Sequence, residues 1–148
     1  HTTRLARDAE TPRLAAQLMI YPVTDFRDDD GRYPSREQNA DGYFLTSADM
    51  KWFRGHYVAT ADPNDPTLSP VLAEDLAGLP PAVVVTAEYD PLRDEGESYA
   101  RALEQAGVRV TMKRYDGLIH GFFDLAALSP AAAGAVRETC ENLRRLLT

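Results

Sequence analysis

The sequence predicts an α/β protein with a parallel sheet, because apolar runs of strand length alternate with helix-like stretches. The runs are residues 14–23, 82–87 and 108–115, and an amphipathic stretch follows each of the last two. Such alternation favours right-handed crossovers between parallel neighbours. A chain of 148 residues is long enough for one core and too short for two domains. We therefore expect a single unit of three parallel strands with flanking helices.

Each predicted strand has its own pattern. Residues 14–23, LAAQLMIYPV, are almost continuously apolar, as expected for a strand covered on both faces of a parallel sheet. Residues 82–87, AVVVTA, are rich in β-branched side chains. Residues 108–115 alternate apolar and polar positions, which predicts a third strand near an edge.

Three helices are predicted around these strands. Residues 2–9 are typical of the tail of an amphipathic helix, so the sequence opens inside a helix. A second helix starts at Asp90-Pro91 and ends at Gly107, and a third starts at Pro130. In the third helix we expect Cys140 to be a small core residue. Its predicted apolar stripe is Val136, Cys140, Leu143 and Leu147.

The composition excludes several classes of function. The chain carries 16 Lys and Arg against 23 Asp and Glu, so its net charge is −7 and nucleic acid is not an expected partner. Its longest apolar runs are far shorter than the roughly 20 residues that span a bilayer, so we expect no membrane span. A single cysteine rules out an internal disulfide, and no secretory leader opens the sequence. We therefore expect a cytoplasmic protein.

Residues 24–79 form a long excursion of acids, prolines and aromatics between the first two strands. More than fifty residues are unusual for a plain connection and favour an inserted lid or pocket element. Thr46 and Asp49 fit a capping box, which predicts one helix of about three turns after Thr46. Its aromatic side chains fit either a core or a pocket wall.

Asp90 and His120 are the candidate catalytic residues, because each follows a predicted strand and adjacent parallel strands end at the same edge of a sheet. A carboxylate that holds one imidazole nitrogen is what a general base requires. Each residue also has a plain structural interpretation. Asp90 before Pro91 is a helix cap, and His120 can simply pack in a turn. Asp116 and Asp124 are alternative partners for the histidine.

The sequence lacks the features of two other kinds of site. Its three histidines, at positions 1, 56 and 120, have no i, i+4 spacing, and its acidic runs break the order of a calcium loop. We therefore expect no metal. Its serines lie in PSRE, LTSAD, TLSPV, GESYA and LSPAA, and none of these fits the G-x-S-x-G nucleophile elbow.

Three motifs in order resemble those of a known family: QNADGYFLT, then LPPAVVVTAEYDPLRDEG, then HGF. With this order, residues 1–148 resemble the C-terminal half of a bacterial hormone-sensitive-lipase-like esterase of the α/β-hydrolase fold. The resemblance covers essentially the whole chain. It implies a serine carboxylesterase that needs no cofactor and no metal, acting on a small acyl ester.

The resemblance also implies roles for particular residues. It puts the acid on Asp90 and the base on His120, with Asp94 and Glu95 as residues of the helix start. The serine elbow and the oxyanion loop then lie upstream of position 1, so this chain alone is expected to be inactive. Residues 24–79 become part of a cap over the acyl pocket. The expected pocket-lining residues are Phe44, Trp52 and Phe53.

Two rival functions stay open at this point. One is a nucleophile-free α/β-hydrolase-like module for binding or assembly, in which Asp90 caps its helix and His120 packs. The other is amide cleavage or acyl transfer on the same triad. In addition, the strand at residues 14–23 lacks one neighbour of the family's sheet, so we expect homo-oligomers or other association through its open edge.

Overall fold

The protein, a computed structural model that describes residues 2–10, 12–27 and 31–148, has a three-stranded parallel sheet in the order β1-β2-β3. The strands are β1 (Gln17–Ile20), β2 (Ala82–Tyr89) and β3 (Val110–Ile119). This arrangement confirms the predicted α/β class. It also places β3 at an edge, as its alternating pattern predicted.

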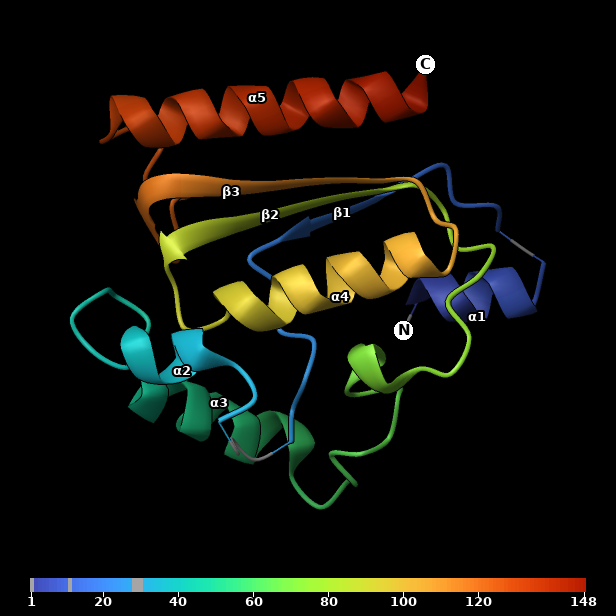
Figure 1. Ribbon diagram of the computed structural model, residues 1–148, viewed down its shortest axis with the longest axis horizontal. Helices are drawn as coiled ribbons and strands as arrows, with labels where there is room; N and C mark the ends of the chain where they lie inside the picture. Colours follow the sequence, from blue (N-terminus) through green and yellow to red (C-terminus); the bar gives the residue numbers. More distant parts are fainter. Residues whose placement is uncertain (1, 11, 28–30) are drawn as a thin grey trace.

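Helices cover both faces of the sheet (Figure 1). The long helix α5 lies over one face, and α4 lies over the other, while α2 and α3 lie beyond α4. The helices are α1 (Thr2–Asp8), α2 (Pro34–Gln38), α3 (Ser47–Val58), α4 (Arg93–Gln105) and α5 (Pro130–Leu147), with a 3-10 turn, η1 (Pro70–Leu72). No described helix is both long and apolar enough to cross a membrane.

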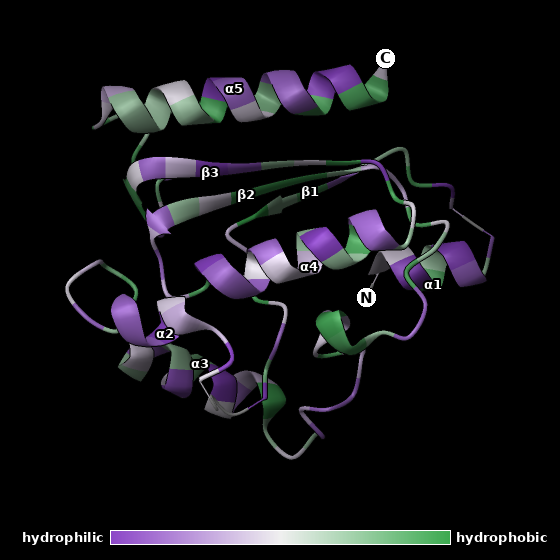
Figure 2. Cartoon of the chain, viewed as in Figure 1, coloured by the Kyte–Doolittle hydropathy of each residue, from purple (hydrophilic) through white to green (hydrophobic). Residues whose placement is uncertain are grey.

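The central strand β2 supplies both layers of the core. Ala82 and Val84 point into a cluster with Tyr99 and Leu103 of α4. The alternate residues of β2 point to the other face, where they pack against the first turns of α5 and the segment after β3. Figure 2 shows most of β2 as apolar, whereas β3 and the helices mix polar and apolar residues. The members of that second cluster include Val83, Val85, Ala87, Tyr115, Phe122, Ala132 and Ala135.

The register between β2 and β3 has one irregularity that positions the site. Ala87 is opposite Tyr115, but Tyr89, two residues later, is opposite Ile119, four residues later. Gly117 lies within this irregular stretch with a φ of 73° and donates its N–H to Oε2 of Glu88 at 2.7 Å. The paired ends of the two strands are therefore Tyr89 and Ile119, and each is followed by a candidate catalytic residue.

The stripe predicted for α5 is wrong by about one position. Cys140 is exposed, and Leu147 is 56% exposed. The buried residue is instead Thr139, whose hydroxyl lies 2.9 Å from the Tyr115 hydroxyl and donates to the carbonyl of Ala135. A polar residue takes the core position because both of its hydrogen-bonding needs are met there.

The inserted segment, residues 24–79, holds the predicted helix and two elements that were not predicted. The capping box is present, with reciprocal bonds between Thr46 and Asp49, and it starts α3. The short α2 and the 3-10 turn were missed, because five- and three-residue elements have too little periodicity to detect. The first strand is also shorter than predicted, because Tyr21 leaves the extended conformation with a φ of 35°.

Candidate active site

Asp90 follows β2, is fully buried and uses its two carboxylate oxygens for different partners. Oδ1 accepts the main-chain N–H of Leu92 at 2.8 Å, which fixes the turn before α4. Oδ2 lies 2.8 Å from Nδ1 of His120. The predicted helix start at Asp90-Pro91 is wrong by a few residues, because α4 begins at Arg93 with Leu92 as its N-cap. Asp90 therefore stabilises the turn before α4 through Oδ1 and contacts the histidine through Oδ2.

His120 follows β3, and its side chain is 19% exposed. Because its Nδ1 faces a carboxylate, which can only accept, that nitrogen carries the proton and donates it. The other ring nitrogen, Nε2, is then the one able to exchange a proton with another group. Within the described chain, neither Asp116 nor Asp124 makes a hydrogen bond to His120.

Tyr21 packs against this histidine from the end of β1. The two ring centroids are 4.3 Å apart with an interplanar angle of 53°. Tyr21 has left-handed backbone angles, which for a bulky residue cost roughly 1–3 kcal/mol and concentrate at functional sites. Burial raises the pKa of the Tyr21 hydroxyl, and the charges of Asp124 and Asp90 raise it further. Sequence analysis missed this contact, since a positive φ at a tyrosine has no sequence pattern.

A cavity of about 720 Å³ opens beside His120. The end of β1 supplies Tyr21 and Val23 to its wall, and α3 supplies Met50 and Phe53. The wall is mainly apolar, with charged side chains at Asp25 and several basic residues. The basic lining residues are Arg27, Arg36, Lys51 and Arg54. Its volume lies within the range of small-molecule pockets, about 300–1,000 Å³.

The three residues expected to line the pocket occupy different places. Phe53 lines the cavity. Phe44 is 73% exposed and is not among the cavity-lining residues; its ring lies against Gly121, the residue after His120. Trp52 is also outside the lining and is 60% exposed, with its ring against Phe53. The structure thus brings Phe53 to the cavity and Phe44 to the histidine loop, the segment that carries His120 and Gly121 after β3.

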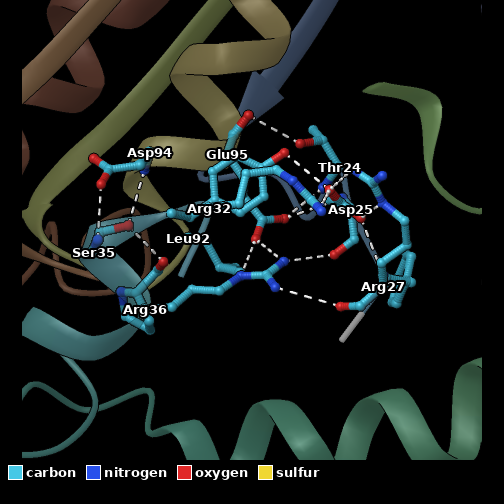
Figure 3. A network of polar contacts seen from close by, with 12 residues as sticks. Thr24, Asp25, Arg27, Arg32, Ser35, Arg36, Leu92, Asp94 and Glu95 are labelled. Carbon is cyan, nitrogen blue, oxygen red and sulfur yellow. Dashed lines mark hydrogen bonds and ion pairs between the residues drawn. The ribbon is translucent and has the colours of Figure 1, made fainter. Parts of the chain in front are cut away.

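A buried network holds the inserted segment to the start of α4 (Figure 3). Arg36 donates to Oε2 of Glu95 from Nε at 2.9 Å and from Nη2 at 2.5 Å. Oε1 of Glu95 accepts the main-chain N–H groups of Thr24 at 2.8 Å and Asp25 at 3.3 Å. Burial raises the pKa of the Glu95 carboxyl, while Arg36 and the two N–H groups act against this rise.

A second carboxylate, Asp25, lies in the same network. It accepts hydrogen bonds from Arg27, Arg32 and the Tyr33 hydroxyl. Burial acts to raise the pKa of Asp25, but the bonds from Arg27 and Tyr33 outweigh it and hold this pKa well below its usual range. Burial and the bond to Asp25 raise the pKa of Tyr33 to about 12.

The described residues contain no cluster of three His, Cys, Asp or Glu side chains that could hold a metal. Two serines of the inserted segment are fully buried, and both have structural bonds. The Ser35 hydroxyl donates to the carbonyl of Pro91 at 2.8 Å, and the Ser69 hydroxyl donates to that of Pro63 at 2.7 Å. Neither hydroxyl is next to His120.

Known proteins with the same arrangement identify the family. A protein-family model described as alpha/beta hydrolase fold matches residues 1–124. The chain belongs to this α/β-hydrolase family. It is 41% identical over 151 aligned positions to the carboxylic ester hydrolase LipN of Mycobacterium tuberculosis, covering 98% of this chain and 39% of LipN. It is 38% identical to an ethyl acetate hydrolase of Pseudomonas putida, covering 95% of this chain and 43% of that protein.

Solved esterase structures superpose closely on this chain. A crystal structure of the esterase rPPE with (S)-Ac-CPA superposes with a TM-score of 0.90 at 46% identity, covering 99% of this chain and 46% of rPPE. A thermostable esterase from Pseudomonas putida gives a TM-score of 0.89 at 44% identity, with the same coverage of each chain. The resemblance to a C-terminal portion of hormone-sensitive-lipase-like esterases is thereby confirmed, and the chain spans less than half the length of these relatives.

Proposed function

We propose that the intact protein is a carboxylic ester hydrolase and that this chain supplies the acid and the base of its triad. The observation that carries the proposal is the 2.8 Å bond between Asp90 and His120 at the wall of an apolar cavity. The esterases among its relatives and structural neighbours support the reaction class. The nucleophile is a serine outside these residues, since no serine here has an elbow context.

In this mechanism the serine oxygen attacks the ester carbonyl carbon while Nε2 of His120 accepts the serine proton. The tetrahedral intermediate then collapses, the bond to the alcohol oxygen breaks, and Nε2 donates its proton to the leaving alcohol. Water attacks the acyl-enzyme by the same route and releases the carboxylic acid. Asp90 stays ionised throughout, holds the Nδ1–H tautomer and stabilises the imidazolium.

The cavity has the properties of an acyl pocket under this proposal. Its apolar wall, with Met50 and Phe53 from α3 and Val23 from the end of β1, suits the hydrocarbon part of a small ester. The inserted segment, residues 24–79, then acts as a cap over the reacting atoms. Phe53, which lines the cavity, is proposed to contact the bound substrate, and Trp52, whose ring packs against Phe53, is proposed to support it.

The test is turnover of an ester panel by the intact protein, with His120→Ala and a matched His56→Ala. His56 is exposed on α3, with its ring against Trp52, and takes no part in the mechanism. We expect His120→Ala to lower turnover by several orders of magnitude, because only binding and oxyanion contributions, about 10³ to 10⁴ over water, survive the loss of a triad member. His56→Ala should turn over normally. Near-normal turnover by His120→Ala would refute the proposed role.

A further inference from the structure

We propose that residues 39–45 of the inserted segment form a clamp that positions the Asp90–His120 pair. The inference rests on the proposed function, because it assigns a purpose to contacts with the proposed acid and base. The clamp reaches both sides of the pair. One end of it is bonded to the main chain at Asp90, and the other end packs on the residue after His120.

The first contact is made by Asn39, a buried polar residue with 4% exposure. Its Nδ2 donates to the main-chain carbonyl of Asp90 at 3.2 Å and lies 3.5 Å from that of Glu88. The amide nitrogen must face these oxygens, since both are acceptors. Asn39 is itself fixed as the C-cap of α2, where its main-chain N–H bonds to the carbonyl of Ser35 at 3.0 Å. The inserted segment thus holds the acid through the main-chain carbonyl of Asp90.

The second and third contacts are aromatic. Tyr43 stacks on Tyr89, the residue before Asp90, with ring centroids 4.8 Å apart and planes 17° apart. Phe44 lies over Gly121, so that a Cβ added to this glycine would be 3.1 Å from Cε1 of the ring. The backbone of Gly121 is left-handed, with a φ of 80°. A side chain at position 121 would therefore be strained and would also meet the Phe44 ring.

The conformation of the clamp also indicates a positioning role. Phe44 adopts a φ of 75°, which is rare for an aromatic residue, and its side chain is largely exposed. Burial of the ring cannot explain the strained backbone. The strain instead directs the ring onto the loop that carries His120, and such strain is typical of functional positions. Asn39 and Phe44 are accordingly positioning residues, because they act through Asp90 and His120 and not on the reacting atoms.

The clamp can be tested with two pairs of variants in the intact enzyme. Asn39→Asp keeps the shape of the side chain but removes both donors, and Asn64→Asp is its control in an exposed turn of the same segment. Phe44→Leu removes the ring, and Phe44→Tyr restores it. Kinetics give kcat and KM separately. NMR gives the resonances of the His120 Nδ1 proton and the Gly121 amide proton in the enzyme without substrate. This readout therefore does not depend on activity.

We expect Asn39→Asp and Phe44→Leu to lower kcat about tenfold or more with KM nearly unchanged, because a small misplacement of reacting groups has effects of this size. The His120 Nδ1 resonance should move in Asn39→Asp, and the Gly121 amide resonance should move in Phe44→Leu. Phe44→Tyr and Asn64→Asp should behave as wild type. If Asn39→Asp fails to fold, the Phe44 pair decides by the same readouts.

Two results would overturn the clamp. One is a normal kcat in both Asn39→Asp and Phe44→Leu while His120→Ala is inactive, which removes the clamp and leaves the proposed function standing. The other is a raised KM at normal kcat, which would make these residues substrate contacts. Full turnover by His120→Ala is a different failure, since it refutes the proposed function itself.

Discussion

Arg36 and Glu95 form a buried ion pair that joins the inserted segment to the first turn of α4, five residues after Asp90. The sequence alone assigns Glu95 only to a helix start and gives Arg36 no role. The carboxylate is fully satisfied, with two bonds from Arg36 and two from main-chain N–H groups. The cap-like segment is therefore held by a carboxylate in the first turn of α4, close in the chain to Asp90.

Removal of one partner of this pair should be costly. Arg36→Met leaves the Glu95 charge buried without its cation, so we expect the free energy of unfolding to fall by about 3–5 kcal/mol. Arg101→Met is the matched control, since Arg101 is 52% exposed and lies 3.6 Å from Glu97. Glu97 is buried but keeps two bonds from Arg114 when Arg101 is replaced, so we expect Arg101→Met to lose less than about 1 kcal/mol. Urea denaturation of both variants measures the difference, and equal losses would contradict the prediction.

The two bonds of Asp90 can be separated by Asp90→Asn. The side-chain oxygen of asparagine can accept the same bond from the Leu92 N–H, so the turn before α4 and the stability of the protein should persist. The new amide cannot hold the same His120 tautomer, so ester turnover by the intact protein should fall by about 10⁴. Thermal melting and kinetics are measured together. Retained stability with retained turnover would leave Asp90 only its role in the turn before α4.

Asp25 should make stability depend on acid pH. Its pKa in the folded protein is depressed, whereas in the unfolded chain it is about 3.9. The folded state therefore favours the ionised form, and this contribution is complete above about pH 4 and is lost as the pH falls further. Asp25→Asn should be less stable at neutral pH and should lose less stability below pH 4. Denaturant midpoints from pH 7 to pH 2 measure the pH dependence of stability in the wild type and in Asp25→Asn. The same dependence in both proteins would contradict the prediction.

Two helical glycines should respond oppositely to alanine. In Gly96→Ala the new Cβ would lie 3.3 Å from both Pro22 Cδ and Thr86 Cγ2, so overpacking of about 1–3 kcal/mol offsets a propensity gain of about 1 kcal/mol. In Gly134→Ala the nearest atom is 3.9 Å away on the flexible side chain of Arg137. We expect Gly96→Ala to lower the melting temperature and Gly134→Ala to raise it. A rise in both would show that α4 can move away from the sheet.

The edge of β1 should promote association of the isolated chain. Leu18 is 37% exposed and Val23 43% exposed, and within the described residues β1 pairs with β2 alone. An open apolar strand edge is a template for pairing with another chain. Light scattering should show dimers or larger species, and Leu18→Lys should reduce them. A monomeric wild-type chain would argue against association through β1.

The sequence predicted the sheet and the Asp90–His120 contact because both follow from periodicity and chain order. Three apolar runs defined the strands, and parallel neighbours must end at one edge. The face of α5 was misplaced because Thr139 satisfies its hydroxyl inside the core, a compensation that depends on Tyr115 across the layer. Hydropathy alone assigns such a residue to the surface.

Other features of the site depend on tertiary contacts that carry no local signal. Tyr21 and Phe44 reach the histidine loop through left-handed backbone angles, which no composition predicts for aromatic residues. Asn39 resembles any polar loop residue until α2 turns its amide toward the end of β2. The QNADGYFLT motif includes Asn39 and Phe44, but the motif alone does not indicate which strand this stretch contacts.

Several bonds from the inserted segment to the turn after β2 and the start of α4 end on main-chain atoms. Asn39 donates to the carbonyl of Asp90, Ser35 to that of Pro91, and the Thr24 hydroxyl to that of Glu95. A carbonyl oxygen is present whatever side chain its residue bears. Substitutions on the receiving side therefore leave these three bonds intact, whereas the bonds to the Glu95 carboxylate require that side chain. A protein built this way tolerates exchange of its pocket wall, or a graft from a relative, as long as the incoming segment brings the same three donors and a cation for Glu95.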